Sequence, residues 1–570
     1  MSAILFVDPT VPDYESLLQG LDANIKLNIL DANQDGISQI TKALGSGVFD
    51  TVYLVSHGTP GEVKLGTSQL NADTIPTYSS LLAQWSNHLT PGADILLYGC
   101  NVAAGEVGRN FVRELHQATG ADIAASDDAT GSVVLGGNWN LEYATGEITA
   151  PLAFQVEAMA AYNSVLAAFT GGNLVVLRVG TGSAALSGVA TAVFLDEYST
   201  GGGTSVQSIA LPTADSGSNQ TLTQSGSAGS EGALNLSADG RYLTLVGYDA
   251  APGTTGVVGT ASATVNRIVA RVDAAGSIDT STRLNSAYSG NNIRSAVTND
   301  GSGFWVAGQS TGLSYVNFGS TGTSTALNAL NSRVVNIFNG QLYDSSAAGS
   351  NVGVNTVGTG LLTTAGQTVT LLPGATAATN AYAYVLLDRD AGVAGLDTLY
   401  VADQTNANGL LKYSFNGSTW TSRGNITGSF TGLTGVVNGS GVDLYATSGT
   451  AAGNALVKFT DSTAFNSNLT GSLTTLATAP ANTIFKGVAF APRVASNPTV
   501  NLSVSSTTGT EAGQTAITVT ATASSQVTAD RTVLLTVTGT NITTGDYTLN
   551  SLTTNSITMT FSLKVTKLPP

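Results

Sequence analysis

The chain has 570 residues and a formal net charge of −16, with only 10% charged residues and 66 glycines. A chain of this length exceeds what one hydrophobic core supports, so we expect several domains. The negative charge argues against nucleic acid and anionic membrane surfaces as partners. A single cysteine excludes an intramolecular disulfide, and the lack of an apolar run of about 18 residues argues against a membrane span.

The first 165 residues predict a domain in which strands and helices alternate. The apolar segment 4–8 predicts a strand, and because no basic region precedes it, we do not expect a secretory signal peptide. Further strands are expected at 26–30, 51–57, 94–100 and 122–126, with helices at 12–20, 36–44, 75–89 and 107–119 and a helical exit at 150–167. This alternation is typical of an α/β fold with a mostly parallel sheet and helices on both faces.

Two of these strands end in chemically useful side chains. Residues 51–57 end in His57, followed by Gly58, and residues 94–100 end in Cys100, the only cysteine. Parallel strands of an open α/β sheet end along one edge, where ligands bind, so we expect thiol and imidazole side by side. Such a pair is the minimum for nucleophilic catalysis, because the histidine holds the proton while the thiolate attacks. The structural alternative is a buried, inert cysteine and a histidine with ordinary polar partners.

The segments around these residues resemble the caspase- and CHAT-type cysteine peptidases, in which one apolar strand ends in His-Gly and a second ends in Cys. Residues 3–165 are more closely similar to an uncharacterised caspase-like bacterial family, the DUF4347-like domains. The matching segments include Val55-Ser-His-Gly58 and Pro91-Gly-Ala-Asp-Ile-Leu-Leu-Tyr-Gly-Cys100. The resemblance implies a caspase-like fold over residues 1–165, with His57 as general base and Cys100 as nucleophile. Backbone amides near Gly58 and Cys100 would then stabilise the oxyanion.

Three aspartates, Asp8, Asp127 and Asp128, follow predicted strands and should lie at the same edge of the sheet. Each is a candidate for orienting the imidazole or for lining a pocket that binds a basic substrate side chain, as the caspase-like resemblance implies. The structural alternative is an aspartate that caps a turn or a helix. Metacaspase-type sequences carry an aspartate two residues before the cysteine, where this chain has Tyr98, so the position of an acidic pocket stays open.

After residue 169 the sequence changes to short strands separated by turns rich in Gly, Asn, Asp and Ser. A turn followed by an aromatic-bearing strand recurs about every 40 to 60 residues, as in Asp239-Gly-Arg-Tyr242 and Asp300-Gly-Ser-Gly-Phe-Trp305. Four-stranded units at such a period are typical of a β-propeller. Residues 170–494 therefore predict a propeller of six or seven blades, closed by pairing of 486–491 with 173–179. A string of sandwich domains is the alternative.

Residues 498–570 predict a β-sandwich, because 516–522 and 532–538 alternate apolar and polar residues with period two. The segments Thr510-Glu-Ala-Gly513 and Thr544-Gly-Asp-Tyr547 resemble the calcium-binding Calx-β module, here truncated at its end. This resemblance makes Glu511 and Asp546 candidate calcium ligands, since calcium prefers carboxylate oxygens. We expect no cofactor for catalysis.

Two functions stay open. The first is a caspase-like cysteine peptidase that hydrolyses peptide bonds and is carried on a large extracellular or cell-surface protein, exported without an N-terminal signal peptide. Its partners would be a protein or peptide substrate, and an extracellular protein or carbohydrate ligand at the propeller. The second is a non-catalytic adhesive or structural exterior protein with an inactive caspase-like domain. A thiol buried away from water would favour the second function.

Overall fold

The computed structural model describes residues 2–11, 13–133, 137–162, 165–166 and 168–493, together with four strands between residues 500 and 561. The chain divides into two compact units, Met1–Val494 and Ala495–Pro570. Within the described parts, every helix is too short or too polar to cross a bilayer.

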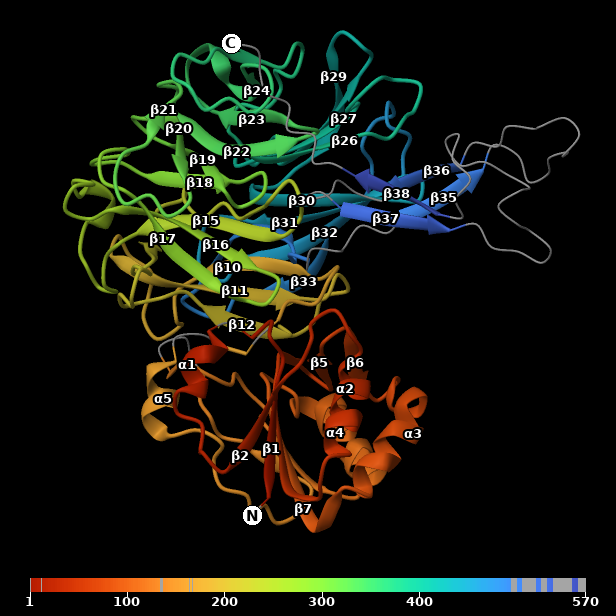
Figure 1. The fold of residues 1–570 in the computed structure, drawn as a ribbon. Coiled ribbons are helices and arrows are strands. Elements are labelled where there is room, and N and C mark those ends of the chain that lie inside the picture. The colour runs from red at the N-terminus through yellow and green to blue at the C-terminus, as the bar shows by residue number, and fades with distance from the viewer. Residues whose placement is uncertain are drawn as a thin grey trace, which may run out of the picture. The chain divides into compact units, whose positions relative to one another are not determined.

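The N-terminal domain is built on a six-stranded sheet in the order β2-β1-β3-β7-β8-β9 (Figure 1). Every neighbouring pair is parallel except β8 and β9, which confirms the predicted mostly parallel sheet. The central strands form because their apolar runs can be buried on both faces. The bounds are β1 (Ala3–Val7), β2 (Ile25–Ile29), β3 (Phe49–Val55), β7 (Leu89–Tyr98), β8 (Asp122–Ala125) and β9 (Tyr143–Ala144).

Helices cover both faces of this sheet, as the alternation predicts (Figure 1). Leu5 and Val7 of β1 belong to the apolar cluster that contains α1 and α5, while Ile4 and Phe6 belong to the cluster that contains α2, α3 and α4. Neighbouring residues of a strand point to opposite faces, so β1 contributes to both cores. The bounds are α1 (Tyr14–Leu18), α2 (Gly36–Leu44), α3 (Ile75–Ser86), α4 (Gly105–Thr119) and α5 (Val156–Ala161).

Two segments lie next to the sheet edge, and the second of them differs from the expectation. A three-stranded antiparallel sheet of β4 (Gly58–Thr59), β5 (Glu62–Leu65) and β6 (Ser68–Asn71) begins directly after His57. The helix expected over 150–167 is restricted to α5 at Val156–Ala161. The backbone of Tyr162 is extended instead, and Val165 forms an antiparallel bridge with Gly131.

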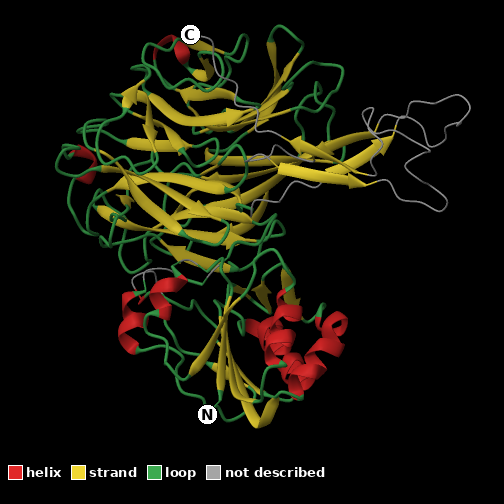
Figure 2. Cartoon of the chain, in the orientation of Figure 1, coloured by secondary structure: helices red, strands yellow, loops and turns green. Residues whose placement is uncertain are grey.

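Residues 174–490 form antiparallel sheets that resemble propeller blades (Figure 2). Four sheets have four strands each: β18 (Ile293–Val297), β19 (Gly303–Gly308), β20 (Gly312–Asn317) and β21 (Thr325–Ala326); β22 (Ser332–Phe338), β23 (Gln341–Ser346), β24 (Gly353–Val357) and β25 (Val369–Leu371); β26 (Ala381–Leu387), β27 (Thr398–Asp403), β28 (Leu410–Phe415) and β29 (Trp420–Ile426); β30 (Phe430–Asn438), β31 (Gly441–Ser448), β32 (Ala455–Asp461) and β33 (Thr474–Thr478).

A larger, nine-stranded sheet joins the two ends of this region. It contains β10 (Leu174–Val179), β11 (Ala190–Tyr198), β12 (Gln207–Ala210), β13 (Thr223–Ser225), β14 (Asn235–Leu236), β15 (Tyr242–Tyr248), β16 (Arg267–Asp273), β17 (Ile278–Leu284) and β34 (Ile484–Phe490). The last strand, β34, pairs antiparallel with the first, β10, in the register Leu174 to Phe490. The predicted pairing between the two ends of this region is therefore present.

The second unit is described only as two antiparallel strand pairs. They are β35 (Val500–Val504) with β36 (Val519–Ala523), and β37 (Arg531–Thr536) with β38 (Ser556–Phe561). The candidate calcium ligands Glu511 and Asp546 lie outside the described residues, so calcium binding stays a prediction.

Candidate active site

The predicted catalytic residues follow two neighbouring strands. β3 and β7 are parallel and adjacent, with Val55 opposite Tyr98, and the Ser56 N–H donates to the Tyr98 carbonyl at 3.0 Å. His57 and Cys100 therefore follow adjacent strands at the carboxyl edge of the sheet. The sequence prediction that strand pairing brings these two positions to one edge agrees with this topology.

Gly58 allows the two strand ends to approach closely. A Cβ atom at this position would lie 2.5 Å from Cγ2 of Val102 and 2.7 Å from the carbonyl oxygen of Cys100. Real Cβ contacts are never this short, so any side chain here would push the two loops apart. The backbone amide of Gly58 is thus held beside Cys100 by a contact that only glycine permits.

The imidazole of His57 is fixed by the backbone of a third loop. Its Nε2 lies 2.9 Å from the carbonyl oxygen of Thr10, which follows β1. The side chain is only 1% exposed, and its Nδ1 has no hydrogen-bond partner among the described residues. A buried polar atom without a partner is unusual, and here it leaves one ring nitrogen available for proton transfer.

Burial lowers the pKa of His57 below its ordinary value of 6.5, and the hydrogen bond that its ring donates to the Thr10 carbonyl opposes this effect only in part. The imidazole is therefore neutral near neutral pH. With Nε2 donating its proton to the Thr10 carbonyl, the neutral tautomer presents Nδ1 as an acceptor. This is the protonation state that a general base requires.

Because His57 is buried in its neutral form, the free energy of unfolding should depend on pH. Below about pH 6.5 the unfolded chain binds a proton at this position and the folded chain does not, so the free energy of unfolding falls as pH decreases. Between about pH 7.5 and 5.5 the wild-type chain should lose about 1 kcal/mol more stability than a His57→Gln variant. Urea denaturation of both proteins at the two pH values measures the difference. Equal losses would contradict a buried neutral imidazole.

The thiol of Cys100 is not open to solvent, contrary to the expectation for a catalytic thiol beside the imidazole. Cys100 is 0% exposed. Its Sγ accepts from the Thr130 N–H at 3.1 Å and lies 3.4 Å from the Thr130 carbonyl oxygen. Thr130 follows β8, on the side of β7 away from β3. No hydrogen bond joins the thiol to the imidazole in the described parts of the chain, so their direct contact stays a prediction.

Burial raises the pKa of the Cys100 thiol to about 12, and the backbone amides of Thr130 and Leu166 lower it only slightly in comparison. The thiol is therefore protonated at neutral pH in this arrangement. A thiolate forms only when a base removes the proton during attack or when the covering groups move away.

The group that covers the thiol is the chain's own exit segment. Leu166 is fully buried; its N–H donates to the Thr130 carbonyl at 2.9 Å, and its carbonyl accepts from the Gly58 N–H at 3.2 Å. The preceding residue, Val165, bridges to Gly131. This short extended segment therefore runs from the end of β8 to the end of β3, across the position of the thiol. Sequence analysis missed it because residues 150–167 were expected to be helical.

The three aspartates near this edge have partners within the fold. Asp8 accepts from the N–H and the hydroxyl of Thr10 and from the Gly66 N–H. Through Thr10 it therefore fixes the loop whose carbonyl holds His57. Asp127 lies 3.8 Å from Arg109 in an exposed ion pair, and Asp128 accepts from Asn138. The proposed binding of a basic substrate side chain by these carboxylates stays a prediction.

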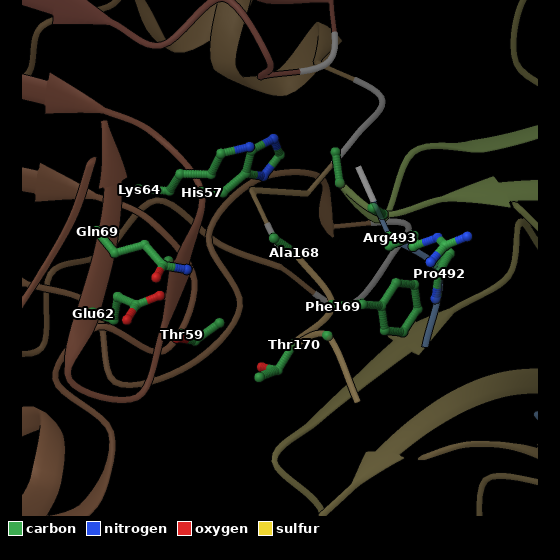
Figure 3. A pocket seen from close by; sticks show the side chains of 14 residues that line it. His57, Thr59, Glu62, Lys64, Gln69, Ala168, Phe169, Thr170, Pro492 and Arg493 are labelled. Carbon is green, nitrogen blue, oxygen red and sulfur yellow. The ribbon is translucent and has the colours of Figure 1, made fainter. Parts of the chain in front are cut away.

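A cavity of about 220 Å³ opens next to His57 (Figure 3). Glu62, Lys64 and Gln69 line one side, and Phe169 and Arg493 line the other. Its lining includes residues 168–171, which follow Leu166 in the chain. The cavity therefore lies on the carboxyl side of the covering segment and contains both positive and negative side chains. Within the described residues, no group of three or more His, Cys, Asp or Glu side chains is placed to hold a metal ion.

Residues 4–166 match the model of a protein family described as a domain of unknown function (DUF4347), so the chain contains a DUF4347 domain at this position. This confirms the DUF4347-like resemblance. No curated protein matches the sequence.

The β-rich region that follows resembles propeller and lactonase-type structures. One similar structure is a candidate 6-phosphogluconolactonase from Bacteroides uniformis, at 11% identity over 54% of this chain and 83% of that protein, with a TM-score of 0.32. Another is BamB from Moraxella catarrhalis, at 14% identity over 51% of this chain and 92% of that protein, with a TM-score of 0.24.

Proposed function

We propose that the DUF4347 domain is a caspase-like cysteine peptidase that hydrolyses peptide bonds with Cys100 as nucleophile and His57 as the proton-transfer group. The observation that carries the proposal is the convergence of three groups at the ends of β3 and β7. The ends of these adjacent strands carry a thiol and an imidazole oriented through Nε2, and a backbone amide is held beside the backbone of Cys100. Nucleophile, base and orienting group are the parts that covalent catalysis requires.

In this mechanism the Gly58 N–H donates to the carbonyl oxygen of the substrate, where negative charge develops. The Leu166 carbonyl occupies that position in the structure and stands in for a substrate carbonyl. The thiol attacks the carbonyl carbon as Nδ1 of His57 takes its proton, and the imidazolium then protonates the leaving nitrogen. The thioester is hydrolysed by water. Thr10 serves as a positioning residue, since its carbonyl holds the imidazole through Nε2 and leaves Nδ1 as the acceptor.

The β-rich region is proposed as a binding module. Its nine-stranded sheet divides into two four-stranded groups plus the short β14, which together with the other four sheets corresponds to a six-bladed propeller. A propeller of this kind would bind an extracellular protein or carbohydrate and hold the peptidase domain near its substrate. An extracellular or cell-surface location, and calcium binding by a Calx-β-like second unit, are further parts of this proposal.

One observation favours the alternative of a non-catalytic exterior protein. The thiol is fully buried and protonated, and a cysteine in that state is chemically inert. The two functions differ in what happens when the covering segment leaves. A peptidase then gains a reactive thiol that depends on His57, whereas a structural domain gains only an ordinary surface cysteine.

The test is a full-length Leu166→Asp variant, because a carboxylate cannot stay in the apolar position of this side chain and should displace the segment. A leucyl chloromethyl ketone should label Cys100 of this variant at least about tenfold faster than free cysteine, and the variant should hydrolyse a peptide library. A second substitution, His57→Gln, should reduce hydrolysis at least about a hundredfold.

Leu166→Met is the matched control, since it preserves apolar character and volume and should stay covered. Thermal unfolding of each variant shows that the domain is folded under the assay conditions. Labelling no faster than free cysteine, and unchanged by His57→Gln, would establish the structural alternative.

A further inference from the structure

The covering segment is bound in the manner of a peptide substrate. Val165 and Leu166 are added in extended conformation to the backbone that follows β8, through the bridge to Gly131 and the bond from the Leu166 N–H to Thr130. Addition of an extended strand to an exposed backbone edge is a common way of binding peptides, with main-chain hydrogen bonds giving affinity and side-chain pockets giving specificity. Here the Leu166 side chain fills such a pocket completely.

The carbonyl of Leu166 is placed for reaction rather than only for binding. Its oxygen accepts from Gly58, the amide proposed to stabilise the oxyanion. Leu166 also lies next to the nucleophile. Its N–H and the Cys100 thiol both contact the Thr130 carbonyl, and the Leu166 amide lowers the pKa of the thiol. Leu166 therefore binds the Gly58 amide through its carbonyl and lies next to the thiol through its own amide.

The proton-transfer group lies at the cavity next to the covering segment. His57 lines the cavity together with Ala168 and Phe169, which follow Leu166 in the chain. Figure 3 shows His57 and Ala168 facing this space. Nδ1 of His57 is buried and has no partner among the described residues, so it can protonate a nitrogen that leaves toward the cavity.

We propose that the peptide bond on the carboxyl side of Leu166 is the domain's own substrate, cut within the same molecule by Cys100. This inference rests on the proposed peptidase function. It assigns the substrate class as peptides with leucine or a similar apolar residue before the cut. Cleavage separates the DUF4347 domain from the β-rich region in the chain and frees the thiol of its cover.

The reaction balances without any added reagent except water. Sγ forms a bond to the Leu166 carbonyl carbon, the carbon–nitrogen bond breaks, and the thiol proton passes through His57 to the leaving amine. Water then attacks the thioester, one of its protons passes through His57 to the sulfur, and the carboxylic acid formed at Leu166 releases the other proton to solvent to leave a carboxylate. The products are residues 1–166 and residues 167–570.

The experiment follows the purified full-length chain at about pH 7.5 by gel electrophoresis and intact mass. Two fragments with the masses of residues 1–166 and 167–570 should appear. The first-order rate constant of their appearance should not change over a tenfold range of protein concentration. Cys100→Ala should stay whole. His57→Gln should be cut at least about a hundredfold more slowly.

The Leu166→Asp variant separates this inference from the function on which it rests. If it hydrolyses added peptides while the wild-type chain stays whole, the peptidase function holds and self-cleavage is overturned. An observed first-order rate constant that rises in proportion to protein concentration would also overturn it, since the reaction would then occur between molecules. If neither chain cuts any peptide, both proposals fail.

Discussion

The thiol of Cys100 should react with iodoacetamide at least about a thousandfold more slowly in the intact folded chain than in the urea-unfolded chain at about pH 8. Burial raises its pKa from 9.0 to about 12, and each unit lowers the fraction of reactive thiolate about tenfold. Steric cover by Leu166 adds to this effect. Because Cys100 is the only cysteine, labelling of the whole chain reports on this one site.

A matched control comes from a second position on the same domain. Val107 on α4 is 67% exposed, so Val107→Cys in a Cys100→Ala background provides an open thiol on the same fold. It should react at nearly the rate of a free cysteine. If native Cys100 were labelled as fast as this control, the segment at Leu166 would not cover the thiol in solution. Labelling should accelerate in the Leu166→Asp variant and, if the chain cuts itself, after cleavage.

Substitution Lys412→Met should destabilise the β-rich region by about 3 kcal/mol, because it leaves a buried carboxylate without one of its two cations. Nζ of Lys412 lies 2.8 Å from Oδ2 of Asp461, and Arg389 lies 3.3 Å from the same oxygen. The lysine and aspartate side chains are 0% exposed. Arg389 stays in place after the substitution, which keeps the loss at the lower end of the range for broken buried ion pairs.

Lys458→Met is the corresponding control, since Lys458 pairs with Asp443 at 3.0 Å with 29% of its side chain exposed. A partly exposed pair contributes little, so this change should cost less than about 1 kcal/mol. Urea denaturation followed by tryptophan fluorescence measures both variants. If both variants lost the same free energy of unfolding, the ion pair between Lys412 and Asp461 would stabilise the contact between β28 and β32 no more than a partly exposed pair does.

The parts of the fold that followed from the sequence are those set by local pattern. Apolar runs of strand length before His57 and Cys100 predicted buried neighbouring strands, and β3 and β7 are parallel neighbours. Turn residues at regular intervals predicted four-stranded units after residue 169. The pairing of β34 with β10 was also predictable, because a ring of sheets leaves its first and last strands to pair.

The environment of the two reactive groups was not predictable in the same way. The carbonyl of Thr10 that orients His57 is 47 residues away in the chain and belongs to the backbone, which every residue type provides. No side-chain pattern identifies such a group. Leu166 likewise reads as one apolar residue in an expected helix, and only the bridge between its neighbour Val165 and Gly131 reveals a different backbone pairing.

The sequence by itself determined which residues carry a thiol and an imidazole, and which strands bring them to one edge of a sheet. Only the tertiary structure decided that Cys100 is covered and protonated and that the covering residue belongs to the same chain. Side-chain periodicity and turn chemistry act over a few residues and are visible in a sequence. Burial and backbone pairing between distant segments arise only when the chain is packed, and they set the protonation state and the access of both groups.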